Sequence, residues 1–320
     1  MRGVRGWGLG AGREKAAAAF LGTAMILASP SWLLAKGKAG ATGAAFLKIA
    51  PGARAAALGE AFTAVADDAS AIQWNPAGLG WLKKSEFTAT HGQWIQQSDH
   101  NYLAAAVPAR WGTLGISITS FSVPDIAKRA ADTDAADGTF DSRDAAYGVA
   151  WGRALGDRWS VGATAAYVRQ TLDGHSAGAP MLNLGALWRT AGGRFTAGAA
   201  VRNLGGEIKF DEEGDPLPMT AAAGAAYRTL NGRLLLSGDV RVPAQGDAAE
   251  SVGIELSRPL FRDGRGALRA GYDSSSAEAV NGTGLALGTG LSFGRWGFDL
   301  TWAPYGVLGD TFRYGFRVLF

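Results

Sequence analysis

The stretch FRYGFRVLF, residues 312–320, places aromatic or aliphatic side chains at every second position. These apolar residues are Phe312, Tyr314, Phe316, Val318 and Phe320. Arg313 and Arg317 lie between them. A period of two residues is typical of a β-strand whose two faces meet different environments. The stretch predicts a strand that turns its aromatic face to lipid and its arginines to a wet interior.

The same alternation recurs along the chain, and we mark fourteen such segments from residue 84 onward. Their approximate ranges are 85–95, 99–108, 111–122, 142–153, 158–170, 180–190, 193–204, 218–228, 232–242, 248–258, 265–273, 282–293, 295–303 and 310–320. Most have the length that a tilted strand needs to cross the hydrocarbon layer. An even number allows antiparallel closure. The sequence therefore predicts an all-β fold, a transmembrane antiparallel β-barrel of about 14 strands.

The connections between the segments alternate between tight and longer, more polar ones. Tight connections lie at 108–110, 154–157, 190–193, 229–232 and 293–296. Longer ones lie at 123–143, 172–179, 205–218 and 274–281. Short turns on one side and longer loops on the other are typical of outer-membrane barrels. Tryptophans near segment ends, such as Trp94, Trp159 and Trp296, fit interfacial girdles, although core tryptophans of a soluble β protein are the alternative.

The first 35 residues read as a secretory signal peptide. A basic start, with Arg2 and Arg5, precedes the apolar run AAAAFLGTAMILA at 16–28. Cleavage is expected near Ala35 or Ala39, and an uncleaved anchor is the alternative. After residue 40 no apolar run approaches the length of a membrane helix. Export combined with a barrel predicts the bacterial outer membrane as the location, with membrane lipid as a partner.

Charge and composition argue against several other functions. The net charge of +3 is carried by the first 35 residues, so the rest gives no case for nucleic-acid binding. Cysteine is absent, and neither Asp67–Asp68 nor the acidic stretch 211–215 has the ligand spacing of a metal site. We therefore expect no metal and no cofactor. Three scattered histidines form no catalytic pattern, and we expect a protein that is not an enzyme.

Several arginines fall on strand positions that we assign to the lumen. They are Arg169, Arg202, Arg313 and Arg317. Two interpretations are open: they attract anionic ligands, or they pair across the interior with Asp239, Glu255 and Asp299. The near-zero charge of the chain beyond the signal favours pairing.

Residues 41–83 do not alternate and are rich in alanine. Apolar residues from Leu58 to Ile72 are spaced at three or four, which predicts one or two short helices broken at Gly59 or at Asp67–Asp68. The domain prediction is a signal peptide at 1–35, a hatch segment at 36–83 and a barrel at 84–320. The hatch is expected at the periplasmic mouth or inside the lumen as a short helical plug.

Residues 52–79, GARAAALGEAFTAVADDASAIQWNPAGL, resemble the N-terminal signature of the PorV/PorQ family, part of the wider FadL-like superfamily. The shared element reads ADDASA…WNPAGL. The residues that the resemblance marks for hatch or gating roles are Asp67, Asp68, Ser70, Trp74, Asn75, Pro76 and Gly78. The final strand also resembles the recognition signal of outer-membrane assembly machinery, carried here by Tyr314, Phe316 and Phe320.

The resemblance implies two alternative functions. PorV-like members act in type IX secretion, which would make exported cargo proteins or secretion-ring components the partners. FadL-like members pass small hydrophobic compounds such as fatty acids. This chain has modest outer loops for a fatty-acid transporter, and the sequence favours the secretion-linked, cargo-binding role, with the FadL-like channel as the alternative.

Overall fold

A computed structural model of the chain describes residues 42–132, 135–278 and 282–320. The predicted signal peptide lies outside these residues. Fourteen strands form one closed antiparallel barrel, as predicted. They are β1 (Glu86–Gln93), β2 (Asp99–Ala109), β3 (Gly112–Lys128), β4 (Gly138–Leu155), β5 (Trp159–Leu172), β6 (His175–Arg189), β7 (Phe195–Gly205), β10 (Thr220–Thr229), β11 (Leu234–Pro243), β12 (Ala249–Phe261), β13 (Gly264–Asp273), β14 (Leu285–Phe293), β15 (Trp296–Pro304) and β16 (Asp310–Leu319).

Each strand pairs with its neighbour in the chain, and the first strand closes the ring against the last. In this closing pair Glu86 lies opposite Leu319, and Gln93 lies opposite Phe312. Every segment predicted from alternation corresponds to one strand. Two loops are shorter than expected, because β3 and β4 continue as a hairpin beyond Val123 and β5 turns into β6 at Asp173 and Gly174.

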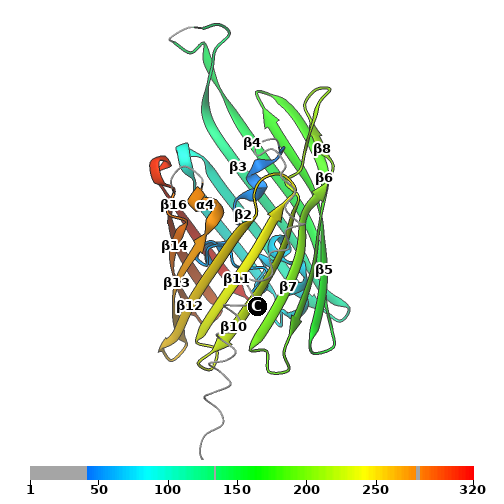
Figure 1. Cartoon of the computed structure of the whole chain (residues 1–320), viewed down its shortest axis with the longest axis vertical. Helices are drawn as coiled ribbons and strands as arrows, with labels where there is room; N and C mark the ends of the chain where they lie inside the picture. The colour runs from blue at the N-terminus through cyan, green and yellow to red at the C-terminus, as the bar shows by residue number, and fades with distance from the viewer. Residues whose placement is uncertain (1–41, 133–134, 279–281) are drawn as a thin grey trace, which may run out of the picture. The chain divides into compact units, whose positions relative to one another are not determined.

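The two ends of the barrel differ in their connections (Figure 1). One end, here the short-turn end, carries the turns 110–111, 156–158, 190–194, 230–233, 262–263 and 294–295. The other, the long-loop end, carries the remaining connections. These hold η3 (Ile95–Gln97), α4 (Ser274–Glu278), η5 (Gly306–Leu308) and a separate hairpin of β8 (Glu207–Lys209) and β9 (Gly214–Pro216). The predicted asymmetry of turns and loops is therefore present, apart from the tight β5–β6 turn.

The outer wall of the barrel is apolar. Ile116, Val149 and Leu268 are 62%, 61% and 64% exposed, although each lies within a strand. Small or polar residues such as Ser117 alternate with them and are buried on the inner side. A closed barrel that is apolar outside and polar within is the arrangement that spans a membrane.

Residues 42–83 form a plug inside the barrel. Its helical pieces are η1 (Ala45–Lys48), α2 (Ala53–Ala57), α3 (Ala71–Trp74) and η2 (Pro76–Trp81). The piece α2 contacts β13–β16, and η2 contacts β3–β6. Leu58, Phe62 and Ile72 are completely buried between plug and wall. No helix among the described residues is both long and apolar enough to cross a membrane.

The plug runs through the lumen from one end to the other. At the long-loop end, the backbone N–H of Gly43 donates to the carbonyl of Pro216, next to the β8–β9 hairpin (Figure 1, blue). At the short-turn end, the plug leads into β1 at Glu86. Of the two expected positions, the lumen is therefore the one observed for residues 42–83.

The last strand matches its predicted alternation with one exception. Arg313 is buried inside the barrel, whereas Tyr314 and Phe320 are 46% and 70% exposed on the outside. The ring of Phe316 stacks on Trp296 at a centroid distance of 5.6 Å. The exception is one of exposure: Val318 shares the parity of Tyr314 and Phe320 but is only 5% exposed. Its partners on the two neighbouring strands are Phe87 and Trp296.

Candidate functional site

Asn75 ties the plug to itself and to the wall. Its extended backbone (φ −159°) is the conformation that a residue before proline prefers, and its side chain is completely buried. The amide nitrogen donates to the carbonyl of Thr63 at 2.9 Å and lies 3.3 Å from that of Ala186 in β6. The amide oxygen accepts from the N–H of Ala77 at 3.2 Å. One side chain thus caps η2 and fixes two distant segments of chain.

Pro76 and Gly78 shape the turn that follows. Pro76 opens η2, where a missing backbone N–H costs nothing. Position 78 requires glycine, because a Cβ there would overlap the carbonyl oxygen of Ala66. The hydroxyl of Ser160 in β5 donates to the carbonyl of Ala77 at 2.6 Å, which holds this turn against the wall.

The motif carboxylates Asp67 and Asp68 have different partners. Asp67 accepts from Arg54 at 2.5 Å and from Arg228 of β10 at 2.8 Å. Burial alone would raise the pKa of Asp67, but the two guanidinium groups outweigh it and hold that pKa below its usual range. Asp68 accepts from the N–H and the hydroxyl of Ser70 at 2.9 and 2.5 Å. Burial, together with the charge of Asp67, raises the pKa of Asp68.

Arg54 continues this cluster into an ion-pair network on the wall. It lies 2.8 Å from Glu255 of β12, which also accepts from Arg269 of β13 at 2.6 Å. Arg269 in turn reaches Asp299 of β15 at 2.6 Å. The predicted pairing of Glu255 and Asp299 with Arg169, Arg202, Arg313 or Arg317 is therefore wrong. Instead, Asp299 pairs with Arg269 of the wall, and Glu255 pairs with both Arg269 and Arg54 of the plug.

The arginines predicted to face the lumen differ in their positions and contacts. Arg169 lies on the exposed side of β5 and donates to Ser176, so its assignment to the lumen is wrong. Asp239, a predicted partner, instead accepts from the backbone N–H groups of Phe62 and Thr63 at 3.0 and 2.8 Å. Arg202 and Arg313 form no ion pair within the described part of the chain.

Glycines on the inner wall allow the plug to approach the strand backbones closely. They are Gly115, Gly152, Gly162, Gly185, Gly198, Gly253, Gly271 and Gly288, here called the glycine belt. A Cβ at Gly185 would overlap the amide oxygen of Asn75, and one at Gly271 would overlap the backbone of Gly59. At most of these positions the strand backbone lies directly against the plug backbone, and at Gly115, Gly185 and Gly288 it lies against a plug side chain, so no position of the belt has space for a further side chain.

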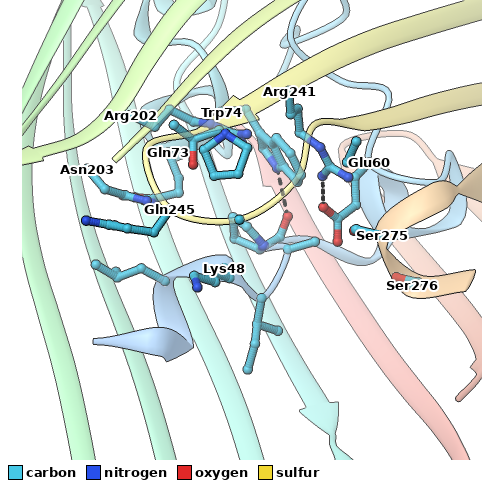
Figure 2. A pocket seen from close by; sticks show the side chains of 18 of the residues that line it. Lys48, Glu60, Gln73, Trp74, Arg202, Asn203, Arg241, Gln245, Ser275 and Ser276 are labelled. Atoms are coloured by element: carbon cyan, nitrogen blue, oxygen red, sulfur yellow. Dashed lines mark hydrogen bonds and ion pairs between the residues drawn. The ribbon is translucent and has the colours of Figure 1, made fainter. Parts of the chain in front are cut away.

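Trp74 connects the motif with an adjoining cavity. Its indole N–H donates to the carbonyl of Pro51 at 3.0 Å, and its ring meets Phe62 edge-on at 6.0 Å. The guanidinium of Arg202 in β7 lies over the same ring, 4.9 Å from its centroid. Figure 2 shows Arg202 beside Trp74 and Gln73.

This cavity, here called the mouth cavity, lies between the plug and the long-loop end and has a volume of about 350 Å³ (Figure 2). Trp74, Trp94 and Tyr305 line it together with Leu47, Ile49, Pro51 and Pro243. Its polar lining residues include Lys48, Glu60, Gln73, Arg202, Asn203, Arg241, Gln245 and Ser276. Arg241 forms ion pairs with Glu60 and with Asp273. Burial lowers the pKa of Lys48.

Of the residues predicted to act in the hatch, the structure brings only Trp74 to this cavity. Asn75, Pro76 and Gly78 pack against the wall, and Asp67 and Asp68 lie in the ion-pair cluster. No local pattern in the sequence marked Lys48, Gln73 or Tyr305, because they come from the plug and a loop. Arg202 could be found from the sequence, because it is a charged residue at a strand position that alternation assigns to the lumen.

Comparisons with known proteins bear on the fold. A model of an uncharacterised protein family, UPF0164, matches residues 23–151, which include the ADDASA…WNPAGL element. No curated protein matches the chain.

Solved structures with a similar fold include three channels or transporters. The toluene transporter TbuX of Ralstonia pickettii has a TM-score of 0.57 at 14% identity, over 84% of this chain and 98% of that one. The monoaromatic hydrocarbon channel CymD gives 0.57 at 10% identity, over 84% and 97%. The toluene transporter TodX of Pseudomonas putida gives 0.51 at 10% identity, over 78% and 92%. At these identities the similarity shows a shared barrel fold.

Proposed function

We propose that the chain is a FadL-like outer-membrane channel for small, largely apolar compounds, which enter at the mouth cavity and pass the plug. The observation that carries the proposal is the mouth cavity itself, a hollow of about 350 Å³ with three aromatic rings on its wall. Ligand sites are typically concave and mostly apolar, with a few polar groups that fix orientation. The proteins with similar folds are named for transport of toluene or monoaromatic hydrocarbons, which supports this direction.

The proposal includes an orientation and a role for the plug. Longer loops face outward in outer-membrane barrels, so the long-loop end faces the cell exterior and the short-turn end the periplasm. The predicted signal peptide would direct export to that location. Passage toward the periplasm then requires the plug to shift, and Asn75, with the carboxylates Asp67 and Asp68, holds it in place. These are the gating roles that we assign to the motif.

The secretion-linked role, with exported cargo or secretion-ring components as partners, stays a prediction from the sequence resemblance. No contact in the described residues favours it over a channel. Assembly machinery as a partner likewise rests on the sequence of the final strand.

The test is uptake of radiolabelled toluene and benzoate by Gram-negative cells that carry the chain in their outer membrane. Ala249 lines the mouth cavity and is 6% exposed, so Ala249→Trp would fill the space. Ala223 on the exposed side of β10 provides a matched control, Ala223→Trp. We expect faster uptake of at least one probe with the wild-type chain and the control, and loss of that gain with Ala249→Trp. Uptake that is the same with and without the chain would refute the proposal.

A further inference from the structure

Arg202 is a cation beside the mouth cavity that forms no ion pair with the residues that the structure describes. It projects from β7, stacks on Trp74 and lines the cavity. Its Nε atom is buried and has no hydrogen-bond partner among the described residues. A buried, unpaired charged group is costly, and proteins normally pair such groups.

The carboxylates nearest to Arg202 are already engaged. Glu60 forms its ion pair with Arg241, and Arg241 also reaches Asp273. Asp239 accepts two backbone N–H groups from the plug. Of the other charges that line the cavity, Lys48 and the exposed Asp247 also form no ion pair in the part of the chain that the structure describes. Among the described residues, the lining charges without an ion pair are therefore the guanidinium of Arg202, the ammonium group of Lys48 and the carboxylate of Asp247, which leaves one positive charge in excess.

A second unpaired arginine lies close by. Arg313 is 3% exposed, stacks over Trp94 at 5.0 Å, and has two nitrogen atoms, Nε and one Nη, without hydrogen-bond partners in the described residues. Trp94 is itself part of the cavity lining. Arg313 shares a small adjoining hollow with Glu60 and Asp273, and both of these carboxylates pair with Arg241.

The remaining lining residues indicate the size and the aromatic character of the ligand. Trp74, Trp94 and Tyr305 offer aromatic faces, and the volume of about 350 Å³ suits a compact ligand with one ring. A planar carboxylate matches the fork of an arginine side chain. A neutral hydrocarbon of the same size would leave Arg202 unpaired.

We propose that the mouth cavity binds a compact aromatic carboxylate, whose ring packs among Trp74, Trp94 and Tyr305 and whose anionic group pairs with Arg202. The inference rests on the proposed function, because it names the substrate class of the same site. Lys48, from the plug, adds a second positive charge to the lining. Binding thus joins a wall residue of β7 to residues of the plug.

The experiment is isothermal titration of the purified full chain in detergent at neutral pH with benzoate and with benzamide, its neutral isostere. We expect benzoate to bind at least about tenfold more tightly, as a charge-assisted hydrogen bond would provide. Arg202→Gln should weaken benzoate binding by about tenfold or more and leave benzamide binding unchanged. Arg158→Gln, at an exposed arginine of the short-turn end, is the matched control and should change neither affinity.

Three outcomes would overturn the inference: equal affinities for the two probes, benzoate binding that survives Arg202→Gln, or equal losses for both probes in that variant. The last result would indicate a structural role for Arg202. Mobility of the unheated protein on a gel shows whether the variant is a folded barrel. If cells take up toluene through the chain but benzoate is not preferred in titration, the channel function stands and the carboxylate inference fails.

Discussion

The amide nitrogen of Asn75 lies 2.9 Å from the carbonyl oxygen of Thr63, and this hydrogen bond joins two parts of the plug that are twelve residues apart. Both residues are completely buried. The same amide group also reaches the backbone of β6 and β7. The side chain of Asn75 is therefore a junction between the folded plug and the barrel wall.

Asn75→Leu should loosen the plug without unfolding the barrel. The change leaves the carbonyl of Thr63 and the N–H of Ala77 without partners, and each unsatisfied buried group costs about 1–3 kcal/mol. We expect faster amide hydrogen exchange over residues 60–80 and unchanged exchange in the strands. Asn101→Leu is the control, because among the described residues the side-chain amide of Asn101 bonds to the exposed His91 and not to the plug. Slow exchange over the plug in Asn75→Leu would contradict this prediction.

Gly185→Ala should displace the plug, because the added Cβ would overlap the amide oxygen of Asn75. Gly192→Ala is a matched control in the same β6–β7 region, where nothing lies within 4 Å of the added atom. Overpacking of this kind costs about 1–3 kcal/mol. We expect a lower melting temperature of the plug for Gly185→Ala alone, measured by exchange at increasing temperature. Equal melting temperatures of the plug in the two variants would show that the wall or the plug can shift to accommodate the added methyl group.

Stability of the plug should fall in acid because of Asp67. Arg54 and Arg228 hold the pKa of Asp67 below its usual range. The two ion pairs therefore contribute stability above the unfolded pKa of about 3.9, and this contribution is lost as the pH falls through the lower folded pKa. Asp67→Asn should remove that part of the pH dependence.

The measurement for Asp67 uses the absence of cysteine from the natural chain. Ala64→Cys places one thiol at a position that is 1% exposed in the plug. Its labelling by a pyridyl disulfide, which reacts in acid as well as at neutral pH, reports plug opening. We expect labelling to accelerate between pH 4 and pH 2 less in Asp67→Asn than in the parent. An equal acceleration in both would assign the acid sensitivity to other groups.

Phe320→Ala should reduce the amount of barrel assembled in the outer membrane but leave the stability of the refolded protein unchanged. The ring is 70% exposed, so its loss removes little packing, and the backbone N–H still donates to Ser85 at 2.9 Å. Val307→Ala, at another exposed apolar residue, is the control. The readout is the fraction of heat-modifiable protein in membrane preparations. Normal assembly of Phe320→Ala would argue against the final aromatic residue as a recognition signal.

The barrel was predictable because strand periodicity is a local property. Residues such as Ile116 and Leu268 alternate with small inward residues, and each strand carries this signal by itself. The extension of β3 beyond Val123 was missed because residues 123–128 follow no apolar alternation. They lie in a hairpin that continues past the rest of the barrel, where no lipid imposes the pattern (Figure 1).

The site was less predictable because its contacts join residues far apart in the chain. Arg54 and Glu255 are 201 positions apart, and nothing local to either residue indicates the pair. Alternation assigned Arg313 to the lumen correctly but not Arg169, where the predicted face of β5 was the wrong one. Arg202 has no carboxylate partner among the described residues because Glu60 pairs with Arg241 and Asp239 accepts from the plug backbone. Only the folded structure shows these contacts.

The close fit between the plug and the glycine belt constrains the order of assembly. A finished cylinder would have no clearance through which residues 52–81 could be threaded, because Gly271 already lies against the plug backbone and Gly185 against the side chain of Asn75. The sheet must instead wrap around the plug while it is still open. The β1–β16 pairing joins the two ends of the sheet, so a misplaced plug would keep these two strands apart.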